Sequence, residues 1–265
     1  MKITALVENQ SNSTAKAVHG LALYIETPGH RLLFDVGPDS TLFENSGSLG
    51  IDLLGIDTVV ISHGHKDHGG ALEQFLKLNH SAKVYIQRKA FENHYSKSGF
   101  LKGKVDIGLV PNLQTHPQVI LLDGDYSIDD ELSLFTTPEI GKCKSDANKT
   151  LYSDSGRDDF SHEQSLMIFG GKNVIILGCG HAGVVNIMEK AAEYAPVVCV
   201  GGYHLWNPTT KKTVRDKLLE SITTELAKYD VEFYTCHCTG QTAYRYFSER
   251  LSNMNYLYCG ETIEV

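Results

Sequence analysis

Long apolar runs are missing from this 265-residue chain, and no stretch approaches the roughly 18 residues that a membrane-spanning helix requires. The first ten residues alternate in character as a strand does, so we expect no signal peptide. Cysteine is also sparse, because six residues in a chain of this length are too few for a disulfide framework. These features predict a protein of the reducing cytoplasm without a membrane partner.

The chain also has no excess of positively charged residues. Lys and Arg together number 24 and Asp and Glu 32, which gives a formal net charge of −8. Binding to a phosphate backbone needs a basic face, so we expect no nucleic-acid partner. A small anionic substrate stays compatible with this charge, because a metal cluster supplies its own local positive charge. We therefore expect a small-molecule substrate and a monomer or homodimer.

Hydrophobic periodicity predicts an α/β chain. The apolar, β-branched strand expected at 56–62 forms a βαβ unit with the helix and strand that follow it. The expected strands are 3–7, 21–26, 31–35, 56–62, 83–86, 119–122, 132–136, 165–169, 174–178, 197–201 and 232–235. Helices are expected at 69–78, 184–194, 213–229 and 240–251, and a loop or short helix at 38–50. This order predicts one domain over 1–265, an αββα sandwich of two sheets with helices outside.

Two long polar segments interrupt this pattern. Residues 91–118 and 138–162 are rich in polar, Gly and Pro positions and have little periodicity. Loops of this length inside a compact domain are usually functional. We interpret both segments as lid-like insertions over a site, and Arg157 in the second is a candidate substrate contact.

The strongest motif follows the buried strand directly and reads His63-Gly64-His65-Lys66-Asp67-His68. His63 and His65 lie two apart in an extended loop and can face one metal ion. Asp67 and His68 can reach a second ion about 3.5–4 Å away. Imidazole and carboxylate ligands suit Zn²⁺, with Fe²⁺ or Mn²⁺ as alternatives. The competing interpretation is a solvated histidine-rich loop, which this spacing makes improbable by chance.

Further histidines follow later strands. His181 and His237 each lie between an expected strand and an expected helix, where we predict metal ligands rather than structural histidines. His204 occupies a similar position and is predicted to contact substrate or donate a proton, with direct ligation as the alternative. Its neighbour Tyr203 is a second candidate substrate contact. Of the nearby cysteines, Cys236 and Cys238 are interpreted as non-ligands, and the role of Cys179 stays open.

These residues together resemble the metallo-β-lactamase superfamily over nearly the whole chain. Within it, the segments 178–183, 201–205, 236–240 and 158–166 are similar to the 7,8-dihydropterin-6-methyl-4-(β-D-ribofuranosyl)-aminobenzene-5′-phosphate synthase-like group. The resemblance implies a four-layer αββα fold and a dinuclear site. Many hydrolases of the superfamily have a bridging aspartate at a late strand end, where this chain reads Gly178-Cys179-Gly180-His181. If His181 replaces that aspartate, the metal ions are bridged more weakly.

Three functions are compatible with this pattern. The leading hypothesis is a hydrolase of a small phosphate-bearing or ester-type substrate, in which two metal ions activate water. In that hypothesis Asp67 binds a metal ion and orients the nucleophile, and His204 stabilises an oxyanion or protonates the leaving group. The second is a pterin or phosphoribosyl synthase that uses the same ions as Lewis acids. The third is a non-catalytic metal or ligand sensor.

Overall fold

The chain folds into two large mixed sheets that pack face to face. The computed structural model describes residues 1–97, 103–138 and 141–265. The first sheet has the order β20-β1-β2-β3-β4-β5-β8, and the second the order β19-β18-β15-β14-β13-β10-β9. The strands of the first sheet are β1 (Lys2–Val7), β2 (Ala22–Glu26), β3 (Arg31–Phe34), β4 (Thr58–Ile61), β5 (Lys83–Gln87), β8 (Val119–Leu122) and β20 (Thr262–Glu264). Those of the second are β9 (Tyr126–Ser127), β10 (Leu132–Thr136), β13 (Gln164–Ile168), β14 (Val174–Ile176), β15 (Val198–Gly201), β18 (Glu232–Thr235) and β19 (Met254–Tyr256).

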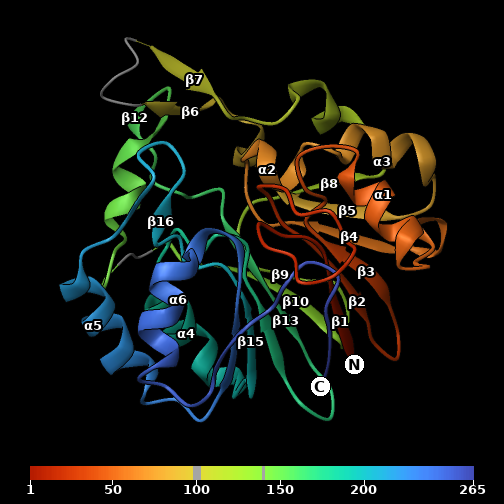
Figure 1. Ribbon diagram of the computed structural model, residues 1–265. Coiled ribbons are helices and arrows are strands. Elements are labelled where there is room, and N and C mark those ends of the chain that lie inside the picture. Colours follow the sequence, from red (N-terminus) through yellow and green to blue (C-terminus); the bar gives the residue numbers. More distant parts are fainter. Residues whose placement is uncertain (98–102, 139–140) are drawn as a thin grey trace.

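Helices cover the outer faces of the two sheets (Figure 1). The helices on the first sheet are α1 (Thr41–Ser48), α2 (Lys66–Gly69) and α3 (Leu72–Leu78). Those on the second are α4 (Val184–Ala191), α5 (Asp216–Leu226) and α6 (Gln241–Ser248). Short 3₁₀ turns connect the elements at η1 (Leu53–Gly55), η2 (Arg88–Phe91), η3 (Pro111–Thr115), η4 (Asp146–Thr150), η5 (Ala192–Tyr194) and η6 (His237–Thr239). None of the helices among the described residues has the length and apolar character needed to cross a membrane.

The apolar core has three layers, which is what a four-layer sandwich requires. The central layer lies between the sheets and joins Phe34 and Val60 of the first sheet to Leu166 and Ile176 of the second. A second layer packs the first sheet against α1 and α3, and a third packs the other sheet against α4, α5 and α6. The predicted αββα fold is therefore confirmed.

The structure corrects several predicted boundaries. The helix predicted over 213–229 begins at Asp216, because residues 212–213 pair as β17 (Lys212–Thr213) with β16 (Trp206–Asn207). The helix predicted over 184–194 ends as α4 at Ala191 and continues as the 3₁₀ turn η5. Helix ends commonly tighten into such a turn, which apolar periodicity does not detect.

The two insertions pair with each other. Strands β6 (His94–Lys97) and β7 (Lys104–Asp106) come from the first, and β11 (Leu151–Ser153) and β12 (Gly156–Arg157) from the second. They form one four-stranded sheet of order β12-β11-β6-β7, in which Tyr95 faces Tyr152 across the β6–β11 pair. This small sheet lies across one end of the sandwich (Figure 1). Because each strand has only two to four residues, the sequence pattern does not predict them.

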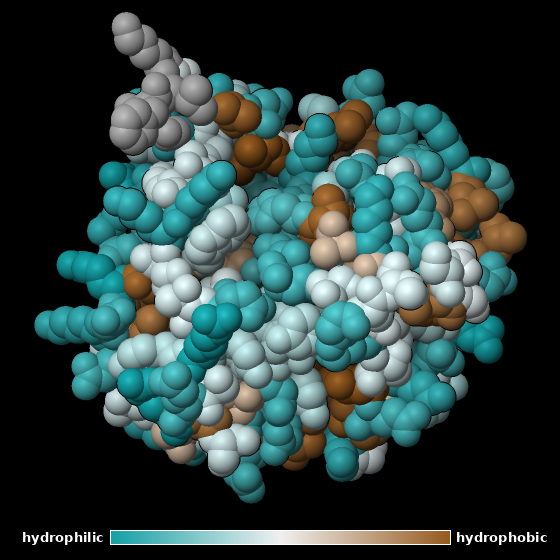
Figure 2. All heavy atoms as spheres, in the orientation of Figure 1, coloured by the Kyte–Doolittle hydropathy of each residue, from teal (hydrophilic) through white to brown (hydrophobic). Residues whose placement is uncertain are grey.

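Hydrophilic side chains cover most of the face shown in Figure 2, and apolar side chains form small separate groups on it. Small groups of this kind are normal for a folded protein surface.

His30, in the β2–β3 turn, joins the two sheets at the other end. Its ring nitrogens lie 2.9 Å from Asp57 Oδ1 and 2.8 Å from Asp129 Oδ2, with Glu131 at 4.0 Å. Burial lowers the pKa of His30, but the two hydrogen-bonded carboxylates outweigh burial, so the net pKa is raised. The stabilisation is therefore complete below the unfolded pKa of about 6.5 and is lost as the pH rises through the raised value.

We accordingly expect His30→Gln to lower the free energy of unfolding more at about pH 5.5 than at about pH 9. Urea denaturation of both proteins at the two pH values measures the difference. An equal loss at both values would show that the ion pairs do not stabilise the sandwich.

Candidate metal centre

The functional side chains follow strands that end at the same edge of the sandwich. The segment 63–68 comes after β4, and the loops after β14, β15 and β18 carry the later histidines. Because β14, β15 and β18 run parallel, their carboxyl ends meet, as in other α/β sites. The loops approach closely: a Cβ at Gly178 would collide with Ser62 Oγ, and one at Gly202 would lie 2.6 Å from Cys238 Sγ.

His63, His65 and His181 form the first group of candidate ligands. Their ring centroids lie 4.5 to 5.0 Å apart, and all three side chains are buried. The Nε2 atoms of all three have no hydrogen-bond partner among the described residues. Burial lowers the pKa of each ring well below its usual range, which keeps the imidazoles neutral. Three neutral, unpartnered imidazole nitrogens that converge in a buried place fit a divalent cation.

Asp67, His68 and His237 form the second group. Asp67 Oδ2 lies 3.5 Å from His237 Nε2 and 3.9 Å from His68 Nε2, and the two imidazole nitrogens are 3.1 Å apart. Burial lowers the pKa of His237 to about 3. Burial also lowers the pKa of His68, but Asp35 and Asp67 outweigh it and raise the net value. Burial raises the pKa of Asp67, whereas the charge of His68 and the contacts with His19 and His237 lower it well below its usual range.

Cys179 belongs to both groups. Its Sγ lies 3.2 Å from His68 Nε2, and its ligand atom is within 4.8 Å of those of His63 and His181. The thiol of Cys179 therefore lies between the two groups of candidate ligands. His181 belongs to the first group only. Burial raises the pKa of this thiol well above its usual range, and a coordinating divalent ion deprotonates a thiol outright. Cys179, which the sequence left unassigned, is thus the candidate shared ligand.

Most of the candidate histidine ligands have an orienting hydrogen-bond partner. Ser62 Oγ lies 2.8 Å from His63 Nδ1, Asp35 Oδ2 lies 2.6 Å from His68 Nδ1, and Asn148 Oδ1 lies 3.0 Å from His181 Nδ1. Asn9 Oδ1 plays this role for His237 Nδ1 at 2.8 Å. Each contact turns the Nε2 atom toward the centre, an arrangement typical of histidines that bind metal ions.

A buried carboxylate connects the insertions to the metal-binding loop. Asp158 lies 2.9 Å from His94 Nδ1 and 3.2 Å from His162 Nε2. The other nitrogen of His162 accepts a hydrogen bond from Gly64 N–H at 2.9 Å. Burial raises the pKa of Asp158, but the hydrogen bonds from His162 and His94 outweigh it and lower the net value. The ligand atoms of these three residues and His65 lie within 4.8 Å of one another, yet their hydrogen bonds point to a structural network.

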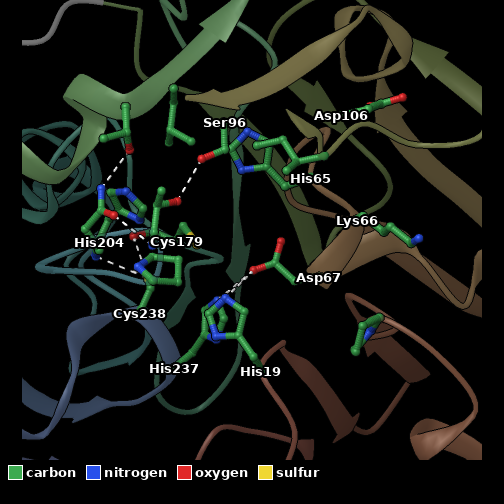
Figure 3. Close-up of a pocket in the computed structure, with 17 residues that line it drawn as sticks. His19, His65, Lys66, Asp67, Ser96, Asp106, Cys179, His204, His237 and Cys238 are labelled. Atoms are coloured by element: carbon green, nitrogen blue, oxygen red, sulfur yellow. Dashed lines mark hydrogen bonds and ion pairs between the residues drawn. The ribbon is translucent and has the colours of Figure 1, made fainter. Parts of the chain in front are cut away.

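A cavity of about 340 Å³ opens beside both groups. In Figure 3, Asp67, His19 and His237 point toward one another, whereas Lys66 and Asp106 point away from them. The cavity is lined by His19, Pro38, His65, Lys66, Asp67, Ser96, Asp106, Ile107, Thr150, Leu151, Cys179, His204, Asn207, Pro208, Thr209, His237 and Cys238. Its size fits a small molecule rather than a polymer.

His204 lies in this cavity, as a substrate contact would. Both of its ring nitrogens are buried without a hydrogen-bond partner among the described residues, and its ring centroid is 4.1 Å from that of His181. Its backbone φ is +47°, and strain of this kind is common at functional sites. Burial lowers the pKa of His204 to about 4, so its imidazole is neutral near pH 7 and suits a hydrogen-bond donor better than an acid.

The other two predicted substrate contacts lie elsewhere. Tyr203 is 1 % exposed and packs in the core beneath α6, near Phe247. Arg157 lies on the exposed strand β12, with its side chain next to Tyr152. Neither is among the described residues that line the cavity. Sequence position alone did not distinguish these side chains from His204.

Several other residues of the centre could not be identified from the sequence. Asn9 and His19 come from the loop between β1 and β2, far along the chain from the other groups. The buried Glu163 carboxylate accepts hydrogen bonds from the backbone N–H groups of His181 and Ala182, at 2.7 and 2.8 Å, and fixes that loop. No motif marks these positions, because their contacts exist only after the strands assemble.

A four-layer sandwich with histidines, a carboxylate and a thiol at its central strand ends defines a metal-dependent class of protein. The family comparison agrees: the family model described as the metallo-beta-lactamase superfamily matches residues 15–152. The chain belongs to this superfamily, whose members usually bind divalent metal ions.

Proteins that match over their full length indicate which part of the superfamily this chain resembles. An uncharacterised protein of Methanocaldococcus jannaschii is 26% identical over 266 residues, which cover 99% of this chain and 100% of that protein. The 7,8-dihydropterin-6-methyl-4-(beta-D-ribofuranosyl)-aminobenzene-5′-phosphate synthase of the same organism is 25% identical over 295 residues, covering 100% and 96%. A crystal structure described as a metal-dependent hydrolase of the beta-lactamase superfamily has a TM-score of 0.82 and 26% identity, covering 100% and 99%. The subfamily resemblance seen in the sequence is thereby supported.

Proposed function

We propose that the protein is a hydrolase that uses two divalent metal ions to cleave a small phosphate-bearing or ester-type substrate. The observation that carries the proposal is the pair of ligand groups that meet at Cys179. His63, His65 and His181 would hold one ion, and Asp67, His68 and His237 the other. Imidazole, carboxylate and thiolate ligands together suit Zn²⁺ best, with Fe²⁺ or Mn²⁺ as alternatives.

The protein supplies the environment for this chemistry. Divalent ions in such sites polarise the substrate and activate water for attack. Asp67 orients the attacking group from the cavity side, where its side chain is 25% exposed. His204 offers a ring N–H to charge that develops on the substrate, because neither of its nitrogens has another partner among the described residues. The insertion sheet covers one side of the cavity through Ser96 and Leu151 and limits the entry of water.

A second candidate function is a synthase that acts on a pterin or phosphoribosyl compound. The full-length similarity to the methanogen synthase favours it, and the same two ions would serve as Lewis acids. The third candidate function is a sensor, which would bind the metal ions but turn over no substrate.

A metal and substrate screen tests the proposal. The purified protein should contain close to two divalent ions and hydrolyse at least one compound in a panel of phosphomonoesters, phosphodiesters, lactones and thioesters. His63→Ala should lose both metal content and turnover, whereas His80→Ala, at an exposed position remote from the centre, should keep both. Two bound ions without hydrolysis of any compound in the panel would contradict the hydrolase. Saturable binding of pterins or phosphoribosyl compounds would then favour the synthase.

A further inference from the structure

Asn9 lies between two histidines beside the second ligand group. Its Oδ1 is 2.8 Å from His237 Nδ1, and its Nδ2 is 3.2 Å from His19 Nδ1. His19 in turn places Nε2 at 3.3 Å from Asp67 Oδ2. One amide therefore contacts a candidate metal ligand and a histidine that the sequence analysis did not single out.

Two backbone groups fix the orientation of this amide. Gly20 N–H donates to Asn9 Oδ1 at 3.2 Å, so that atom must be the carbonyl oxygen. Asn9 Nδ2 donates to the carbonyl oxygen of His237 at 3.3 Å, so that atom must be the nitrogen. A backbone N–H can only donate and a backbone carbonyl can only accept, so a flipped amide would lose both contacts.

The amide then assigns opposite tautomers to the two histidines. His237 must donate from Nδ1 to the Asn9 oxygen, which leaves the lone pair of its Nε2 free to face the second group. His19 must accept at Nδ1 from the Asn9 nitrogen, so its proton lies on Nε2 and faces Asp67 Oδ2. A neutral imidazole has a single lone pair, and that of His19 is already engaged.

We propose that Asn9 and His19 are a positioning pair for the second metal ion, in which His19 donates a hydrogen bond to Asp67 and is not itself a ligand. By distance alone His19 looks like a ligand, because its ligand atom and those of Asp67 and His237 all lie within 4.8 Å of one another. The proton assignment separates the roles of the two histidines. This inference rests on the proposed two-metal function.

The contact between His19 and Asp67 explains why the Asn9–His19 pair affects the second ion more than the first. The oxygen that receives the His19 proton is also the one nearest to His68 and His237. A hydrogen bond to its outer lone pair orients this carboxylate toward the ion, and hydrogen-bonded carboxylate ligands of this kind are common. His63, His65 and His181 have no such dependence on Asn9 or His19 among the contacts of the described residues.

Nuclear magnetic resonance of the metal-free protein tests the proton assignment. Long-range ¹H–¹⁵N spectra at about pH 8, where unperturbed imidazoles are neutral, should place the proton of His19 on Nε2 and that of His237 on Nδ1. Asn9→Asp replaces the donor by an acceptor and should place a proton on His19 Nδ1 as well, because the ring then lies between two carboxylates. A His19 proton on Nδ1 in the wild-type protein would overturn the proposal.

Zinc titration tests the positioning role. His19→Ala should weaken binding of the second ion about 10–100-fold and leave the first unchanged, and His19→Gln, which keeps a side-chain donor, should recover part of the loss. His80→Ala should match the wild type. If His19→Ala leaves the affinity for the second ion unchanged, or lowers the affinity for both ions equally, Asn9 and His19 do not position the second ion. A wild-type protein that binds fewer than two ions would instead contradict the proposed function.

Discussion

Cys179→Ala is expected to weaken binding at both metal positions and to abolish turnover. The thiol lies beside the Nε2 edge of both groups, at 3.2 Å from His68 Nε2 and within 4.8 Å of the His63 and His181 ligand atoms. Loss of an outer partner of a metal ligand already costs about 10–100-fold in affinity. Cys179→Ala removes a shared direct ligand. We therefore expect the affinity for the second ion to fall by more than about 100-fold and the affinity for the first ion to fall by about 10–100-fold.

Cobalt-substituted protein gives a direct readout of the sulfur. The wild type should show thiolate-to-cobalt charge transfer in the near ultraviolet, and Cys179→Ala should not. Cys238→Ala is the matched control, because this second buried thiol lies near Cys179 and His204 but is grouped with none of the histidines of the two ligand groups. If the charge-transfer band survives in Cys179→Ala and disappears in Cys238→Ala, the assignment of the shared ligand is wrong.

Asp158→Ala is expected to destabilise the fold by about 3–5 kcal/mol, because two buried hydrogen bonds to a charged group are lost, each worth about 1.5–3 kcal/mol. Its carboxylate holds His94 of the first insertion and His162 beside the metal-binding loop. Without it, two buried imidazoles lose their acceptor. Urea denaturation of the metal-free protein measures this effect separately from metal binding.

The neighbouring residue provides the control for this experiment. Asp159 is exposed, and its hydrogen bonds are to the Ser161 backbone N–H and hydroxyl, so Asp159→Ala should cost about 1 kcal/mol. Similar losses in the two variants would show that the His94–Asp158–His162 network does not hold the insertions to the core.

The fold is largely predictable from sequence because each layer has a strong periodic signal. The strand β4 is buried throughout, and the segment with histidines at 63, 65 and 68 follows it after the single residue Ser62. His181 and His237 could be singled out because each follows a strand and precedes a helix, which places it at the edge where parallel strands end. The structure brings all of these side chains together at that edge.

The remaining residues could not be predicted, because their roles depend on contacts between distant segments. Asn9 contacts His237, 228 positions away, and Cys179 contacts His68, 111 positions away. The position of Cys179 between the two groups depends on how the sheets pack, so the sequence could only suggest that His181 replaces an aspartate there. Arg157 and Tyr203 were assigned from their neighbours in the chain, and side-chain direction placed both outside the cavity.

The most direct test is anomalous X-ray diffraction from crystals of the zinc-loaded protein. We expect two peaks, one beside His63, His65 and His181 and one beside Asp67, His68 and His237, with the sulfur of Cys179 in contact with both. A single peak away from Cys179, or two peaks with His181 or His237 unbound, would contradict it.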